Sequence, residues 1–210
     1  MIPPQLADGY RRFREERYVR EAERYRALAG GQVPSTMIIA CADSRVDPAS
    51  IFSAAPGELF VVRNVAAIVP PAEQSGLYHG TSAAIEFAVT ELKVSHVVVM
   101  GHGLCGGIAA SLAAVGSAPL GQYLGPWVSL LSGVRDELLA HEPSGDPRRR
   151  QKALEQLAIG YSLANLATFS FVGIAVAERR LSLHGAWFSI ADGELEWLDR
   201  ETGAFERITA

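Results

Sequence analysis

The chain has 210 residues, of which 49% are hydrophobic and 20% charged; this is enough apolar material for one α/β domain with a substantial core, and too much for a disordered chain. Its formal net charge of −4 argues against nucleic acid as a partner of the whole chain. No run approaches the roughly 18 to 20 apolar residues of a transmembrane helix, and the first residues lack the basic start and apolar core of a signal peptide. We therefore expect a cytoplasmic protein without a membrane partner.

The first predicted element is a charged helix over residues 5–29, which Gly30 and Gly31 end. Aromatic and apolar side chains recur in it at mostly helical spacings, among many arginines and glutamates. We interpret it as an amphipathic helix on a protein surface. A basic helix that binds membrane or nucleic acid is the alternative, but glutamates interrupt the basic face, namely Glu15, Glu16, Glu21 and Glu23.

Strands alternate with helices along the rest of the chain. We predict strands at 36–40, 59–63 and 95–100, and helices at 48–53, 81–92, 106–115, 127–141 and 148–167. Thr81 or Ser82 is the expected N-cap of helix 81–92. Residues 116–126 form a Gly/Pro-rich connection, residues 141–147 a polar break, and residues 169–176 fit either a strand or a continued helix.

Asp192-Gly193 is a hairpin signal between the apolar segments 181–190 and 194–198. No linker or repeat divides the chain, so residues 1–210 are predicted to form a single domain. Alternating strands and helices predict an α/β fold, with a mostly parallel central sheet flanked by helices. An N-terminal helical arm, residues 1–31, and a C-terminal β-hairpin complete the expected architecture.

Both cysteines of the chain follow a predicted buried strand. Cys41 comes directly after strand 36–40, and His102 and Cys105 come after strand 95–100. If these strands are neighbours, their carboxyl ends lie at one edge of the sheet, where ligands bind in open α/β folds. Two thiols and one imidazole are one ligand short of the four that zinc prefers, which leaves a position for water and predicts a catalytic zinc site. The alternative is two small buried thiols.

Asp43 and Arg45 lie beside the first cysteine and are predicted to pair. The alternative for this pair is a surface salt bridge worth ~0–1 kcal/mol. Zinc lowers the pKa of a bound water, but two thiolates weaken that effect, so a carboxylate that accepts the water's proton or hydrogen bond would compensate. Arg45 would hold Asp43 ionised and oriented. A free Asp43 carboxylate would instead take the fourth position on zinc and close the site.

With these motifs the sequence resembles the β-class carbonic anhydrases, and among them the plant-like type I members. The resemblance extends from about residue 10 to residue 205. Several motifs occur in one order, and together they are much more specific than any one of them. The matching segments are Cys41–Val46, Pro56–Ala66, Gly80–Val89, Gly101–Gly107 and Leu183–Gly185.

The resemblance implies reversible hydration of CO2 to bicarbonate and a proton, by attack of a zinc-bound hydroxide. It also implies one Zn2+ per subunit and a homodimer, formed through the N-terminal arm, that often pairs into a tetramer. The site residues that it implies are the zinc ligands Cys41, His102 and Cys105, the pair Asp43 and Arg45 that orients the zinc-bound water, and the substrate-binding positions Gln32, Phe60, Phe87 and Gly106.

The sequence departs from its relatives at several positions. Ile38 stands where regulated bacterial members carry a tryptophan of a non-catalytic bicarbonate site. We therefore expect no such site, and Asp43 off the metal at neutral pH. Phe87 stands where plant relatives often carry tyrosine, and Ala67 where asparagine is common. None of these departures removes a zinc ligand.

Two other functions compete with CO2 hydration. The same fold and ligands would suit a hydrolase of CO2-like molecules such as carbonyl sulfide or carbon disulfide. A non-catalytic zinc or redox sensor is the other alternative, but a structural zinc site needs a fourth protein ligand and no Asp43–Arg45 pair. A nucleotide-binding enzyme fits poorly, because the glycines at 101 and 103 lack the later glycine of the fingerprint.

Overall fold

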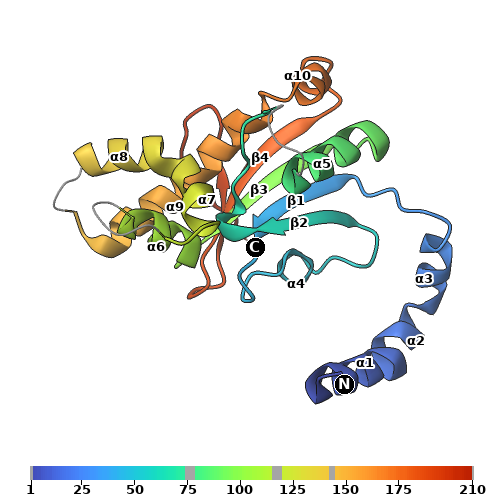
Figure 1. Ribbon diagram of the computed structural model, residues 1–210. Coiled ribbons are helices and arrows are strands. Elements are labelled where there is room, and N and C mark those ends of the chain that lie inside the picture. The colour runs from blue at the N-terminus through green and yellow to red at the C-terminus, as the bar shows by residue number, and fades with distance from the viewer. Residues whose placement is uncertain (1, 74–78, 115–119, 142–144, 210) are drawn as a thin grey trace.

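The protein is built on one six-stranded sheet with the strand order β2-β1-β3-β4-β5-β6 (Figure 1). The computed structural model describes residues 2–73, 79–114, 120–141 and 145–209; parts of the predicted connection at 116–126 and of the polar break at 141–147 lie outside them. The first four strands of this order are parallel, and β5 and β6 are antiparallel. The strands are β1 Thr36–Cys41, β2 Leu59–Asn64, β3 His96–His102, β4 Ser182–Phe188, β5 Leu195–Leu198 and β6 Phe205–Arg207.

This sheet confirms the predicted fold class, including the terminal hairpin of β4 and β5. Strand β6 was not predicted, because a three-residue edge strand has too little periodicity to recognise. The helices are α1 Pro4–Arg12, α2 Tyr18–Arg20, α3 Ala22–Leu28, α4 Pro48–Ile51, α5 Gly80–Glu86, α6 Gly106–Ala113, α7 Leu124–Val128, α8 Ser132–His141, α9 Pro147–Leu166 and α10 Ser170–Ala177.

Three helix predictions needed correction. The arm is not one helix over 5–29: a π-helical turn at Phe13–Arg17 and the non-helical backbone of Glu21 interrupt it. Helix α5 begins at Gly80 with His79 as N-cap, which makes no side-chain cap hydrogen bond, so the cap at Thr81 or Ser82 was wrong. The predicted helix 127–141 is divided, because a 3-10 turn at Ser129–Leu131 separates α7 from α8. The ambiguous segment 169–176 is helical, as α10.

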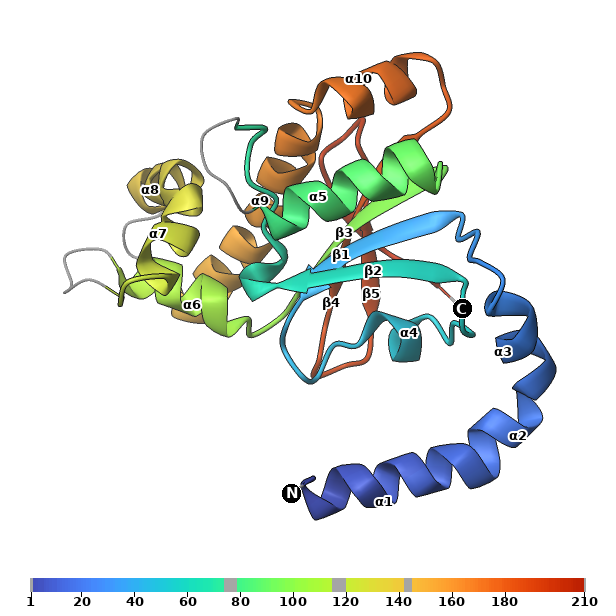
Figure 2. The same ribbon diagram turned by 45° about the vertical axis from the view of Figure 1, so that its right-hand side comes forward.

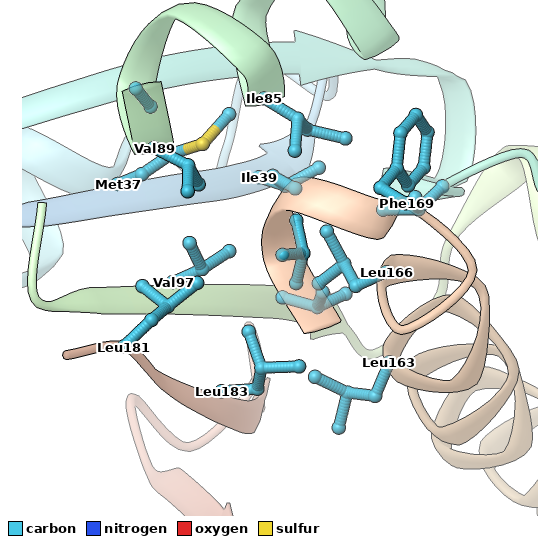
Figure 3. Close-up of a cluster of buried hydrophobic side chains, with 14 of the residues drawn as sticks. Met37, Ile39, Ile85, Val89, Val97, Leu163, Leu166, Phe169, Leu181 and Leu183 are labelled. Atoms are coloured by element: carbon cyan, nitrogen blue, oxygen red, sulfur yellow. The ribbon is translucent and has the colours of Figure 1, made fainter. Parts of the chain in front are cut away.

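Helices α5, α9 and α10 cover one face of the sheet, and α4 lies on the other (Figures 1 and 2). Met37 and Ile39 of β1 pack into the larger core beneath the three helices, together with Leu163 and Leu166 of α9 (Figure 3). Ile38 and Ala40 of β1 point to the other face of the sheet, where they belong to a smaller core that includes Trp197. Burial on both faces explains why the parallel strands read as continuous apolar runs.

The order of the strands creates a switch point at the carboxyl ends of β1 and β3. The chain leaves β1 for β2 on one side, whereas β3 lies on the other side of β1. Ligands of open α/β sheets bind at such a point. Helices α6, α7 and α8 gather beyond these strand ends (Figure 2). Gly101 lets α9 approach β3, since a Cβ there would lie 2.9 Å from the Ile159 side chain.

Helices α1 to α3 extend away from the sheet as an arm in both views (Figures 1 and 2). No residue of these helices is buried within the chain. Among the described residues, no single helix has both the length and the apolar character to cross a membrane; α9 and α10 meet both conditions only as a pair bent by 89°.

Candidate metal centre

Cys41, His102 and Cys105 converge at the switch point. Cys41 ends β1, His102 ends β3, and Cys105 is the N-cap residue of α6. Their ligand atoms lie within 4.8 Å of one another, and all three residues are buried. The two Sγ atoms are 3.9 Å apart. Sulfurs bound at ~2.3 Å to one tetrahedral zinc ion would lie about 3.8 Å apart, so the thiol pair fits that metal.

The imidazole of His102 is oriented for metal binding. Its Nδ1 lies 2.9 Å from the carbonyl oxygen of Gly103, so Nδ1–H donates and Nε2 carries the free lone pair. Nε2 is buried and has no hydrogen-bond partner among the described residues. Such an atom is costly unless something binds it, and a metal ion at the three ligands satisfies it.

The two thiols lie close enough for each to shift the pKa of the other. The neighbouring Cys105 thiol lowers the pKa of Cys41 to about 4, against the opposing effect of burial, and backbone hydrogen bonds from Asp43 and Ala66 also favour this thiolate. The Cys41 sulfur, together with burial, raises the pKa of Cys105. Of the two thiols, Cys41 is therefore the more readily ionised, and both must lose their protons to bind a metal ion.

Asp43 and Arg45 form the predicted pair beside the ligands. Asp43 Oδ1 accepts hydrogen bonds from the Arg45 backbone N–H and from Nε, each at 2.9 Å, and Oδ2 accepts one from Nη2 at 2.7 Å. The Arg45 side chain, followed by its backbone N–H, holds the pKa of the Asp43 carboxyl well below its usual range. Asp43 Oδ2 lies 4.0 Å from His102 Nε2, so the carboxylate stands next to the ligand cluster while both of its oxygens are bound by arginine.

Arg63 secures the first ligand loop. Its Nε donates to the Cys41 carbonyl oxygen at 2.8 Å, and its Nη2 donates to the Asp43 carbonyl. A carboxylate oxygen of Asp47 is 3.6 Å from Arg63, so the closer contacts of this arginine are to the backbone. Hydrogen bonds from a side chain to the backbone carbonyls of a distant loop cannot be predicted from the spacing of residues in the sequence.

The backbone around the ligands includes left-handed residues that are not glycine. Ala66 and Ala67 have φ of 65° and 55°, and Leu104, between His102 and Cys105, has φ of 57°. Asparagine tolerates this region better than alanine, so Ala67 holds a backbone conformation that is costly for its type. Gly107 allows α6 to pack against the backbone at Val65 and Ala66, since a Cβ on Gly107 would lie 2.7 Å from the Val65 side chain. Such backbone outliers cluster at functional sites.

A buried acid behind the ligands was not predicted. Glu155 of α9 is 3% exposed, and its Oε1 accepts the Cys105 backbone N–H at 3.0 Å. Burial raises the pKa of this carboxyl, despite hydrogen bonds that act in the opposite direction. Its position among the apolar residues Leu154, Ala158 and Ile159 of the predicted helix was the available signal.

The predicted substrate-binding residues are divided between the two ends of the sheet. Gly106 is the first residue of α6 beside the cluster, and a Cβ there would meet open space. Phe60 pairs with Met37, four residues before Cys41, or about 13 Å along the strand. Phe87 contacts Phe60, with ring centroids 5.9 Å apart, and Gln32 is exposed before β1. Within one chain, Gln32, Phe60 and Phe87 therefore do not lie beside the metal ligands.

Comparisons with known proteins agree with this site. The family model described as carbonic anhydrase matches residues 36–195. The chain is 36% identical over 197 residues to beta carbonic anhydrase 6, mitochondrial, of Arabidopsis thaliana, covering 91% of the chain and 66% of that relative, which is just under two thirds of its length. It is also 36% identical over 203 residues to a carbonic anhydrase of Pseudomonas aeruginosa, covering 95% of the chain and 89% of the relative.

Solved structures are similar over almost the whole chain. The beta-carbonic anhydrase CcaA matches with a TM-score of 0.89 and 28% identity, covering 97% of this chain and 98% of that one. A structure from a study of two tetrameric beta-carbonic anhydrases of Sordaria macrospora matches with a TM-score of 0.83 and 32% identity, covering 98% of both chains. By fold, sequence and ligand cluster, this chain belongs to the β class of the carbonic anhydrase family.

Proposed function

We propose that this carbonic anhydrase catalyses the reversible hydration of CO2 to bicarbonate and a proton, with one zinc ion per chain. The observation that carries the proposal is the buried cluster of three ligands next to an arginine-bound carboxylate. Cys41, His102 and Cys105 would hold the zinc. When bound, zinc lowers the pKa of a water molecule and so supplies the nucleophile for CO2.

The residues around the ligands have separate tasks in this proposal. Asp43 accepts the hydrogen bond that orients the attacking water, and Arg45 keeps Asp43 ionised and off the metal at neutral pH. Gly106 offers a backbone N–H at the start of α6 for the substrate oxygen. The described residues of the cluster include three protein ligands and no fourth, which suits a catalytic site better than a structural one or a sensor.

The arm supports assembly into a homo-oligomer, and a study of two tetrameric relatives from Sordaria macrospora agrees with it. Leu6, Tyr10 and Val19 of the arm are 60–65% exposed within one chain. A second copy that covered them would also provide a way for Phe60 and Phe87 to line a pocket that their own chain does not complete. A cytoplasmic location stays part of the proposal, supported by two free thiols that suit a reducing compartment.

Stopped-flow CO2 hydration, measured together with zinc content, tests the proposal. Cys41→Ala should lose zinc and activity together, because it removes a ligand. Asp43→Ala should keep its zinc and lose activity about 10- to 100-fold, because a hydrogen bond to a charged group is worth about 1.5–3 kcal/mol.

The parent protein provides the decisive comparison. Zinc-loaded parent that hydrates CO2 no faster than buffer at alkaline pH would refute the enzyme assignment. An Asp43→Ala variant as fast as the parent would leave the enzyme in place but remove Asp43 from its mechanism.

A further inference from the structure

We propose that Glu155 is a positioning residue of the metal centre, which sets the orientation of Cys105 and thereby the affinity for zinc. The inference rests on the proposed zinc site and deepens it. Glu155 lies fifty positions after Cys105 in the chain and comes from α9, an element that supplies no ligand. Its carboxyl group nevertheless contacts the backbone of a ligand directly.

The hydrogen bonds of Glu155 join three parts of the fold. Oε1 accepts the Cys105 N–H at 3.0 Å and the Gln151 amide at 3.1 Å. Oε2 accepts the indole N–H of Trp187, on β4, at 3.1 Å. Gln151 also donates to the Cys105 carbonyl at 3.3 Å. Both backbone polar groups of Cys105 are therefore held from α9.

The support behind Glu155 is rigid. Trp187 is 6% exposed, and the Lys152 ammonium lies 4.2 Å from its ring centroid. Lys152 is in turn 2.6 Å from a carboxyl oxygen of Glu196. Trp187 also packs directly against the turn between His102 and Cys105, since a Cβ on Gly103 would lie 3.0 Å from the Trp187 ring. The segment from His102 to Cys105 is thus held by α9 through Glu155 and by β4 through Trp187.

A role toward the metal explains why an acid occupies this buried position. A buried carboxyl group costs free energy unless all of its oxygens are bonded, and an apolar residue would pack on α9 more cheaply. Helix stability alone does not call for Glu155, because its partners are outside the helix or one turn away. Its bonds instead fix the position of Cys105. The preceding residue, Leu104, has a left-handed backbone that is unfavourable for leucine, so the turn would relax to another conformation without such bonds. Partners of this kind typically contribute 10- to 100-fold in metal affinity.

The test uses four variants of the full chain and three readouts. Glu155→Ala removes the acceptor for Cys105, whereas Glu155→Gln must set its amide against either the Cys105 N–H or the indole N–H. Trp187→Phe removes the indole donor and is combined with Glu155→Gln. Asp146→Asn is the matched control, because it neutralises an acid that bonds the first turn of α9 but no residue of the metal centre or of its support. The readouts are zinc affinity by chelator competition, thiolate-to-Co2+ charge-transfer absorption, and the unfolding of the zinc-free proteins.

We expect Glu155→Ala to lose 10- to 100-fold in zinc affinity and to shift the charge-transfer absorption. Glu155→Gln should lose about tenfold, and the double variant with Trp187→Phe should recover most of that loss, because the conflicting donor is gone. Asp146→Asn should stay within about threefold of the parent. If Glu155→Ala does not fold, the comparison of Glu155→Gln with the double variant Glu155→Gln/Trp187→Phe tests the proposal.

The inference is overturned if Glu155→Gln and Glu155→Ala bind zinc within about threefold of the parent with unchanged charge-transfer absorption. A fall in the stability of the zinc-free protein alone would then assign Glu155 to folding. A parent that binds no zinc would refute the proposed zinc site itself, before any variant is compared.

Discussion

At the scale of single residues, the separation of Asp43 from the metal ligands depends on Arg45. Both carboxyl oxygens of Asp43 accept hydrogen bonds from that arginine, which leaves no oxygen without a partner. The same contacts keep the pKa of Asp43 low, so its stabilising effect is present above the unfolded value of about 4 and is lost only as the pH falls toward the lower folded value. Asp43 is therefore ionised at neutral pH.

Arg45→Gln tests this account. The Asp43 pKa should rise toward 4, and the rate of CO2 hydration at pH 7–8 should fall about tenfold or more, because the carboxylate loses its orientation. The stability difference from the parent should be constant above about pH 5 and shrink below pH 4, as measured by denaturant unfolding at equal zinc content. Arg180→Gln is the control, since it removes an exposed ion pair with Glu178 far along the chain. A variant with full activity would show that the pair is only a surface salt bridge.

At the scale of elements, the local sequence pattern predicted the site residues at the ends of strands. It missed the residues that reach the site from another helix or strand. Cys41 and His102 were predictable because each lies at the carboxyl end of a buried parallel strand, and Cys105 because it follows His102 in the next turn. Arg63 and Glu155 were not, since their contacts span 22 and 50 residues and depend on packing. Element type was predicted well, but the breaks at Glu21 and in the π-helical turn of the arm have no strong sequence signal.

The arm carries an element-scale prediction. Tyr10, Phe13, Tyr18 and Tyr25 form a chain of ring contacts, and none of the four is buried by the rest of the described chain. Tyr10→Asp and Phe13→Asp together should shift the oligomer toward monomer in sedimentation velocity at micromolar concentration, because burying a carboxylate opposes association. Leu157→Asp, at an exposed leucine of α9, is the control for a general effect of such a change. A parent that sediments as a stable monomer would contradict the role of the arm.

At the scale of the whole molecule, the fold brings distant segments to one edge of the sheet. β1 and β3 deliver the ligands, β2 supplies Arg63 to hold their loop, and α9 supports the turn from behind. The sequence predicted this architecture because buried strands and their polar ends are local signals. It did not place Gln32, Phe60 and Phe87 beside the ligands of their own chain, because Gln32 precedes β1, and Phe60, which Phe87 contacts, lies near the start of β2.

Zinc removal and return provide the most direct measurement of the central claim. CO2 hydration is followed by stopped flow in one preparation that has been stripped of zinc and then titrated with it. The rate should rise in proportion to bound zinc and level off at one ion per chain, with all activity absent from the stripped protein. A zinc-saturated protein that hydrates CO2 no faster than buffer at alkaline pH would contradict the account.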